Sequence, residues 1–165
     1  MSKTTKTVLI VCGVLIVVGI PMLLIFLALA IPALQKVTIR ANETSAILSL
    51  RTLNRAEAQY SVVYPQRGFS CSEVALGGDP ASGPPTPEAA HLIPADLAYG
   101  DKAGYTFFIL CPEKALDNHE KVVDYKIIAL PKVIGHSGVR SYCTDEGGEI
   151  KFDPKGGTNC TELLQ

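Results

Sequence analysis

The residues of this chain best suited to chemistry are its cysteines. Four of the five are spread through polar sequence without the spacing of a metal finger, at Cys71, Cys111, Cys143 and Cys160, and the fifth, Cys12, lies in an apolar segment. Four cysteines so placed favour disulfides and an oxidising compartment. Three pairings are open. We favour Cys143 with Cys160 because they flank a short Gly-rich hairpin, which leaves Cys71 for Cys111; the alternative is four free, buried thiols in a cytosolic protein.

The other reactive side chains show no catalytic pattern. The histidines His91, His119 and His136 stand in polar or loop sequence without a His-x-x-x-His or Cys-x-x-Cys companion, so we expect surface histidines. Ser70 lacks a neighbouring base and a strand-to-helix elbow, and a disulfide explains the adjacent Cys71. We therefore predict no catalytic residue, no cofactor and no enzyme activity.

One group of acids surrounds a glycine turn. Asp145, Glu146 and Asp153 offer hard carboxylate oxygens, which calcium prefers, so they are weak candidates for a calcium site. Solvated acids of a turn are the simpler interpretation. The paired Gly147 and Gly148 can take the positive φ that a tight hairpin turn needs, and we expect this turn to join the last two predicted strands.

Charge and length exclude some functions. The chain has 165 residues and a formal net charge of -1, and from Lys36 onward 13 Lys and Arg stand against 16 Asp and Glu. A weakly acidic surface does not hold a phosphate backbone, so we expect no nucleic-acid partner. No small-molecule substrate is evident. After one membrane-length segment is subtracted, about 130 residues remain, which is the usual size of a single domain.

The amino-terminal part is strongly apolar. A run of 27 residues without a charge covers 8–34, which is long enough to span a bilayer as a helix. We predict a cytoplasmic segment 1–7, a transmembrane helix bent by Pro21 and Pro32, and a carboxy-terminal domain outside the cytoplasm. The alternative is a cleaved secretory signal, since Ala-Leu-Ala at 28–30 has the small-x-small form that precedes such a cut.

Beyond the apolar run, an amphipathic helix is predicted over 35–64, ending near Pro65. One face carries a mostly apolar stripe in three- and four-residue steps, made of Ile39, Asn42, Ala46, Leu50, Leu53, Glu57, Tyr60 and Tyr64. The opposite face is expected to meet solvent or another subunit and carries Arg40, Glu43, Arg51 and Arg55. The stripe therefore needs a partner surface.

The remaining sequence predicts a loop and a sheet. Six of the eleven prolines and five of the fourteen glycines fall within 65–100, which predicts a long connecting loop. The region 101–165 holds four strand candidates bounded by Gly, Pro or Asp, at 105–110, 125–130, 139–143 and 149–152. Alternating apolar residues let one face of the sheet cover the helix stripe. The predicted fold is α+β, with a long amino-terminal helix packed on a four-stranded antiparallel meander.

This combination resembles type IV pilins and the pseudopilins of type II secretion, and particular residues carry the resemblance. Ile-Pro-Ala-Leu at 31–34 is similar to the Ile-Pro-x-Leu at the exit of the family's stem. The run 40–54, which contains Asn-Glu-Thr-Ser-Ala and Leu-Arg-Thr-Leu-Asn, is similar to a run in many pilin-like proteins. The segment 138–145, Gly-Val-Arg-Ser-Tyr-Cys-Thr-Asp, is a weaker match. The resemblance also implies a carboxy-terminal calcium loop, as in major pseudopilins.

The resemblance implies a structural subunit of a type IV filament or a type II secretion-type assembly. Its partners would be the lipid bilayer and other pilin-like subunits or further copies of itself, with stems packed side by side and brought close at Gly13 and Gly19. It implies a bacterial inner-membrane protein whose domain is periplasmic, or extracellular in a filament. One departure is clear. With Pro32 on the stem proline, Ile10 stands at the glycine before the prepilin cleavage site and Leu15 at the stem glutamate.

Two other functions stay open. The missing cleavage motif favours a permanently membrane-anchored periplasmic interaction domain that never polymerises, and its candidate surface is the loop 65–100. An anchored enzyme would need polar residues from distant parts of the chain to converge in a pocket. Stem contacts between copies would separate the first of these alternatives from a filament subunit.

Overall fold

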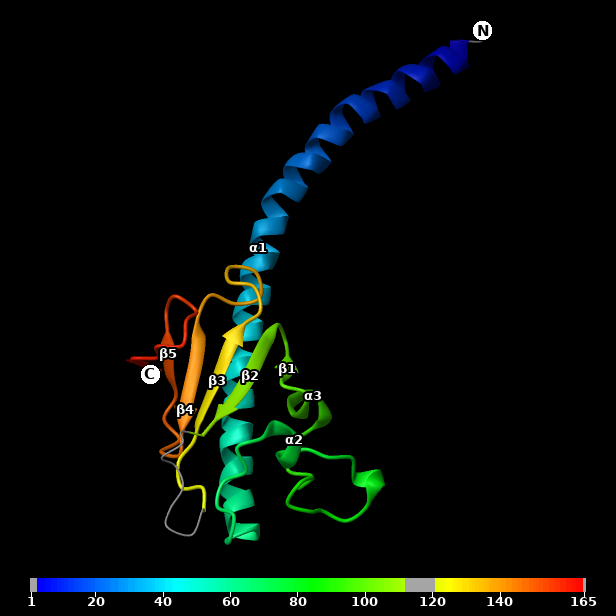
Figure 1. Cartoon of the computed structure of the whole chain (residues 1–165). Helices are drawn as coiled ribbons and strands as arrows, with labels where there is room; N and C mark the ends of the chain where they lie inside the picture. Colours follow the sequence, from blue (N-terminus) through cyan, green and yellow to red (C-terminus); the bar gives the residue numbers. More distant parts are fainter. Residues whose placement is uncertain (1–2, 112–120, 165) are drawn as a thin grey trace. The chain divides into compact units, whose positions relative to one another are not determined.

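The chain forms a long helix and an antiparallel sheet (Figure 1). The computed structural model describes residues 3–111 and 121–164, and contacts divide the chain into two compact units, Met1–Thr38 and Ile39–Gln165. Helix α1 (Lys3–Val63) provides the first unit and the beginning of the second. The α+β class predicted from the sequence is confirmed.

The described residues of the first unit form the amino-terminal part of α1, which is continuous at Pro21 and Pro32. A Cβ added at Gly13 or Gly19 would meet nothing within 4 Å. The large apolar side chains that the structure describes from Leu15 to Phe26 are all more than half exposed. The sequence predicts a transmembrane helix here; among the described residues, no helix is long and apolar enough to cross a membrane.

In the second unit, α1 buries the face that its periodicity predicts. The stripe residues Ala46, Leu50, Leu53, Glu57 and Tyr60 are buried, whereas Arg40, Arg51 and Arg55 on the opposite face are exposed. One prediction is wrong: Glu43, which was expected on the solvent face, is 6% exposed. It is buried because it pairs with Arg140. The helix ends at Val63, close to the predicted end.

In the part of the chain that the structure describes, the sheet has six antiparallel strands in sequence order. They are β1 (Asp101–Lys102), β2 (Tyr105–Leu110), β3 (Lys126–Pro131), β4 (Ser141–Asp145), β5 (Lys151–Asp153) and β6 (Glu162–Leu163). The antiparallel order agrees with the prediction, but the number of strands does not. Strands β1 and β6 were missed because each has only two residues, too few to show an alternating pattern.

The segment between α1 and the sheet is more ordered than predicted. It contains α2 (Glu73–Leu76), the 3-10 helix η1 (Pro80–Ser82) and α3 (Ala95–Ala98). The side chain of Ser72 accepts the N–H of Ala75, and Asp79 accepts that of Ala81, so two of these turns have side-chain caps. One-turn helices are too short for hydrophobic periodicity to reveal.

The core of the second unit lies between α1 and one face of the sheet. Strands β2 to β4 lie alongside this part of α1 in Figure 1. Every second residue of β2 points into the core, so Tyr105, Phe107 and Ile109 are buried while Phe108 and Leu110 are exposed. The core also takes Ile127, Ala129 and Tyr142 from β3 and β4, and Leu76 and Leu97 from the short helices. The sheet thereby supplies the partner surface that the helix stripe needs.

Candidate functional site

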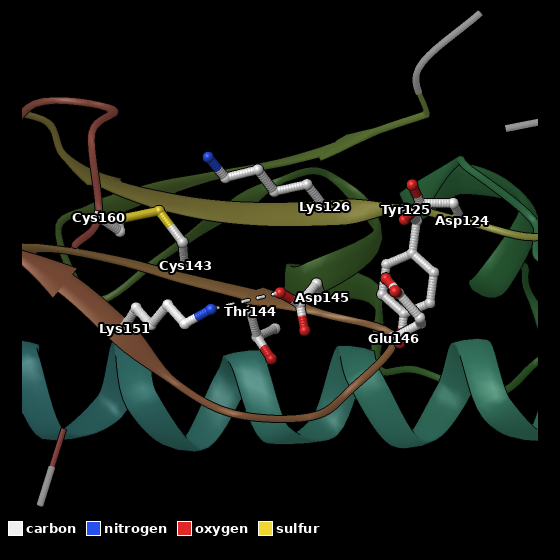
Figure 2. Close-up of a pocket in the computed structure, with 9 residues that line it drawn as sticks. All are labelled: Asp124, Tyr125, Lys126, Cys143, Thr144, Asp145, Glu146, Lys151 and Cys160. Carbon is white, nitrogen blue, oxygen red and sulfur yellow. Dashed lines mark ion pairs between the residues drawn. A yellow bond between two sulfur atoms is a disulfide. The ribbon is translucent and has the colours of Figure 1, made fainter. Parts of the chain in front are cut away.

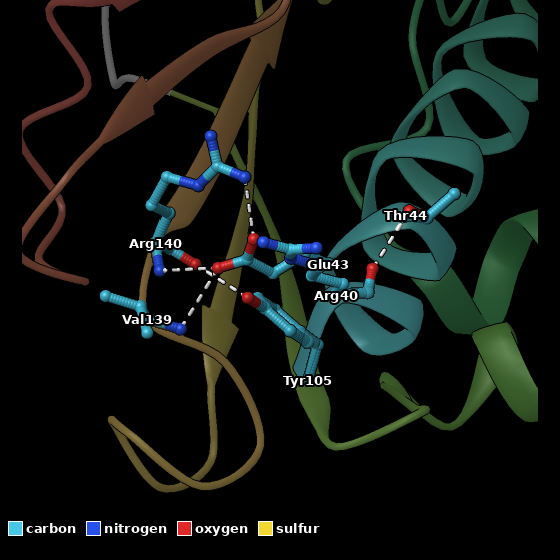
Figure 3. Close-up of polar contacts among 6 residues, drawn as sticks. All are labelled: Arg40, Glu43, Thr44, Tyr105, Val139 and Arg140. Atoms are coloured by element: carbon cyan, nitrogen blue, oxygen red, sulfur yellow. Dashed lines mark hydrogen bonds and ion pairs between the residues drawn. The ribbon is translucent and has the colours of Figure 1, made fainter. Parts of the chain in front are cut away.

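A buried carboxylate joins α1 to the start of β4 (Figure 3). Oε2 of Glu43 lies 2.7 Å from Nη2 of Arg140, and Oε1 accepts the N–H groups of Val139 and Arg140 at 3.1 and 3.2 Å. Burial raises the pKa of Glu43, but the Arg140 guanidinium and the two backbone donors outweigh it, so the pKa lies below its ordinary value. Glu43 is therefore held as an anion where the helix meets the strand.

Two asparagines extend this contact along the helix. Nδ2 of Asn42 donates to the carbonyl oxygen of Ser137 at 2.9 Å, just before β4, and Nδ2 of Asn54 donates to that of Asp145 at 2.7 Å, at the end of β4. We call this set of contacts the helix–β4 seam, made by Asn42, Glu43 and Asn54 with Ser137, Val139, Arg140 and Asp145. It brings the run 40–54 into direct contact with the segment 138–145.

Aromatic rings surround the ion pair of the seam. The Tyr105 hydroxyl donates to the carbonyl oxygen of Arg140 at 2.7 Å. The guanidinium carbon of Arg140 lies 5.6 Å from the ring centre of Tyr142 and 5.4 Å from that of Phe152, within the range of a cation–π contact. Burial raises the pKa of Tyr142 to about 12, which keeps its hydroxyl neutral. Arg140 is thus fixed by its charge partner and by two rings.

A second buried carboxylate, Glu57, holds the chain that follows the helix. It is 0% exposed, and it accepts the backbone N–H and the hydroxyl of Ser70 at 2.7 and 2.9 Å. Burial raises the pKa of Glu57, and the hydrogen bonds from Ser70 offset this only in part. Ser70 precedes Cys71, whose φ of +54° is unusual for a residue other than glycine. Glu57 therefore fixes the backbone that enters a disulfide.

Two disulfides are present, Cys71–Cys111 and Cys143–Cys160, and they are the pairing favoured from the sequence. The first joins the segment after α1 to the residue that follows β2. The second joins β4 to the segment before β6. The second bond thus ties a strand to a segment without regular structure, and the first ties the residue next to the end of β2 to such a segment.

An open pocket of about 370 Å³ lies beside β3, β4 and β5 (Figure 2). Its charged lining residues are Asp124, Lys126, Asp145, Glu146 and Lys151. A hydrogen bond with its own backbone lowers the pKa of Glu146, but burial and the neighbouring Asp124 and Asp145 together raise it above the ordinary value. Nζ of Lys151 reaches Oδ2 of Asp145 only at 3.9 Å. The acids are therefore crowded and only partly compensated.

Of the three calcium candidates, Asp145 and Glu146 line one pocket, whereas Asp153 does not join them. Asp145 ends β4, whereas Asp153 pairs with Ser141 at the other end of that strand. Their Oδ1 atoms accept turn N–H groups, that of Gly147 for Asp145 and that of Lys155 for Asp153. Within 3–111 and 121–164, no group of three or more His, Cys, Asp or Glu side chains is arranged to hold a metal ion. Asp145 and Asp153 act as turn acceptors.

One histidine differs from its prediction. Nε2 of His91 is buried and lacks a hydrogen-bond partner in the described part of the chain, and the φ of this residue is +57°. It lines a second pocket of about 560 Å³, beside α2 and α3, together with Val74, Ile93 and Tyr99 among others. His136 is exposed as expected, and His119 lies outside the described residues. His91 as a whole is half-buried, so it lies at the surface with its Nε2 turned inward beside this pocket.

Comparisons with known proteins identify no relative of this chain. No family model matches it, and no curated protein and no solved structure matches it. Its function is therefore argued from the sequence and from the surfaces and contacts of the described residues.

Sequence reasoning overlooked the two carboxylates of α1 that the fold uses. Glu43 was assigned to the solvent face, and Glu57 was included in the stripe without a partner. Their partners, Arg140 and Ser70, lie 97 and 13 positions further along the chain. The only available signal was an acidic residue within or beside an apolar stripe, which predicts a buried partner without naming it.

Proposed function

We propose that this protein is a pilin-like structural subunit of a type IV filament or a type II secretion-type assembly. The helix–β4 seam is the observation that carries the proposal. The run 40–54 and the segment 138–145 resemble the family independently in the sequence, and Glu43, Arg140 and Asn54 join them in space. A structural subunit needs a rigid domain with surfaces that neighbours recognise, and a charged seam around a compact core supplies the rigidity.

The proposal assigns the stem, 8–34, to the inner membrane before assembly and to packing against other stems afterwards. It rests on the 27-residue run without a charge and on the exposed apolar side chains of the first unit. Lys3 and Lys6 favour a cytoplasmic amino terminus. Two disulfides suit a domain in an oxidising compartment such as the periplasm.

A second candidate function is a permanently anchored periplasmic interaction domain that does not polymerise. Ile10 and Leu15 favour it, because they replace the glycine and the glutamate of the family's cleavage region. The pocket that His91 lines would be its binding surface, since an apolar pocket with an unpartnered polar atom suits a small ligand or a peptide side chain.

Photo-cross-linking of the full chain in bacterial membranes tests the proposal. A photo-activatable side chain is placed at Leu23 in the stem, and at the exposed Tyr99 in a control protein. A ladder of linked copies from position 23 supports the filament subunit, whereas a membrane-bound chain that stays monomeric supports the permanent anchor. Release of the chain from membranes by alkaline carbonate would contradict the assignment of the stem.

The mass of the mature protein supplies an independent measurement. A terminus between Ile10 and Val14 supports pilin-type processing, and an intact Met1 favours the permanent anchor. A terminus at Ile31 would mean that the segment before it is a cleaved signal. Reduction of the same sample should add the mass of four hydrogens, two for each disulfide.

A further inference from the structure

The exposed face of α1 in the second unit carries charge of one sign. Between Ile39 and Val63 the acids Glu43 and Glu57 are buried, and the remaining charged residues, Arg40, Arg51 and Arg55, are exposed. At 3.6 residues per turn, these arginines fall within a sector of roughly 60°. We call them the arginine face.

Among residues 3–111 and 121–164, no acidic side chain forms an ion pair with the arginine face. The ion pairs of the described residues join Arg67 to Glu88, Lys102 to Asp96, Lys132 to Asp101, Arg140 to Glu43 and Lys151 to Asp145, and none includes Arg40, Arg51 or Arg55. Leu48 and Val62 lie on the same side of the helix and are 55% and 78% exposed. Arginine is one of the residues that are enriched at protein interfaces relative to the rest of the surface.

A complementary surface exists elsewhere on the same chain. Asp124 and Glu146 lie at the pocket of Figure 2, and Glu149 is exposed in the segment that leads to β5. We call these three residues the acidic turn. Lys126 and Lys151 stand nearby, but Lys151 is directed to Asp145. The crowding of Glu146 by Asp124 and Asp145 is relieved when a cation approaches from outside.

The seam holds the acidic turn beside the helix without neutralising the arginine face. Asn54 donates to the carbonyl oxygen of Asp145, yet the described ion pairs link neither Arg51 nor Arg55 to Glu146 or Glu149. Each chain therefore presents a basic surface and an acidic surface, both open to a neighbour.

We propose that the arginine face of one copy docks on the acidic turn of a second copy. The inference rests on the proposed function and names the charged contact through which neighbouring domains recognise each other. When the arginine face of each copy docks on the acidic turn of the next, the contact is heterologous, and each end of the row keeps one free surface that can bind a further copy. Such a contact weakens at high salt, since the charges lie at the surface.

Two charge-reversed full-length proteins test this docking. The first carries Arg51→Glu and Arg55→Glu, and the second carries Glu146→Lys and Glu149→Lys. Alone, each presents two surfaces of the same sign, so cross-linked ladders from position 23 in membranes should fall at least tenfold. Mixed in one membrane, the two proteins present complementary surfaces again, and the ladder should return. Lys155→Glu, an exposed reversal outside both surfaces, is the control and should leave the ladder unchanged.

The outcomes separate this inference from the proposed function. If both reversed proteins form ladders like the original chain, the docking is wrong while the filament subunit stands. If each loses the ladder and the mixture does not restore it, the two surfaces do not bind each other and the docking is also wrong. If the original chain forms no ladder, the proposed function fails and the inference fails with it. Unchanged urea unfolding of both variants shows that they fold.

Discussion

Glu43 and Arg140 lie 97 positions apart and form an ion pair of 2.7 Å between the helix and the strand β4. Their side chains are 8% and 38% exposed, so the carboxylate is buried while the guanidinium reaches solvent. Removing one partner of such a pair leaves a charge or hydrogen-bonding group without its match, which costs more than the pair itself contributes. The pair therefore makes helix packing depend on the correct placing of β4.

Replacement of this carboxylate should weaken the domain measurably. Glu43→Gln keeps the size of the side chain and removes the charge that Arg140 and two backbone N–H groups meet, so we expect a loss of about 1.5–3 kcal/mol in the free energy of unfolding. Urea unfolding with the disulfides intact measures it. Arg51→Gln on the exposed face is the matched control and should change stability by less than about 0.5 kcal/mol. Equal losses in the two variants would contradict the role of the seam.

The stability that Glu43→Gln loses should be smaller at low pH than at pH 7. The folded protein lowers the pKa of Glu43 below the ordinary 4.5, so the charged carboxylate stabilises the fold above that value. As pH falls through the folded pKa, the carboxyl becomes neutral and this stabilisation is lost. The difference between the original protein and the variant should therefore be full at pH 7 and shrink below pH 4.5. A constant difference from pH 7 to pH 3 would refute this account.

Glu57 should behave in the opposite way. Burial raises its folded pKa above 4.5, so the folded protein binds the proton more tightly than the unfolded chain, and stability falls as pH rises through this range. Glu57→Gln removes that dependence and can still bond to Ser70. We expect the variant to be at least as stable as the original at pH 7, with its advantage shrinking toward pH 4. Unfolding at both pH values checks the sign, and a variant that is markedly weaker at pH 7 would show that the carboxylate itself is needed.

The two disulfides should contribute unequally. Their cysteines are 40 and 17 positions apart, and a longer closed loop restricts the unfolded chain more. Replacing Cys71 and Cys111 by Ala should cost about 4 kcal/mol, and replacing Cys143 and Cys160 should cost about 3 kcal/mol. Thermal unfolding of the two double variants measures the order. Each variant also serves as the control for the other, because both lose one bond and two sulfur atoms.

Gly138 should not tolerate a side chain. A Cβ at this position would collide with the Tyr105 hydroxyl and ring, which are buried beside the seam. Gly138→Ala should therefore cost about 1–3 kcal/mol by overpacking, and more if the hydrogen bond from Tyr105 to Arg140 breaks. Gly147→Ala is the control, because the nearest atom there belongs to the flexible side chain of Asp145. Similar unfolding midpoints for the two variants would show that Tyr105 can move aside.

The sequence predicted the elements in which apolar residues recur at a regular spacing. In α1 apolar residues recur every three or four positions, and in β2 they alternate with exposed residues. Each pattern can be recognised within one segment of the sequence. The same reasoning failed for α2, α3, β1 and β6, which have two to four residues each. These elements are stabilised by hydrogen bonds and apolar contacts with other segments. The sequence of one segment alone does not show such contacts.

The sequence by itself determined the long helix, its buried face, an antiparallel sheet and the absence of charge from 8–34. Each of these depends on residue types that lie close together in the chain. Only the tertiary structure decided that Glu43 is buried and that Glu57 accepts hydrogen bonds from Ser70. It also decided that Asp145 ends β4 while Asp153, on β5, lies beside the start of β4. The reason is physical. A buried charge is stabilised by a particular partner in space, and which distant residue becomes that partner depends on how the whole chain packs.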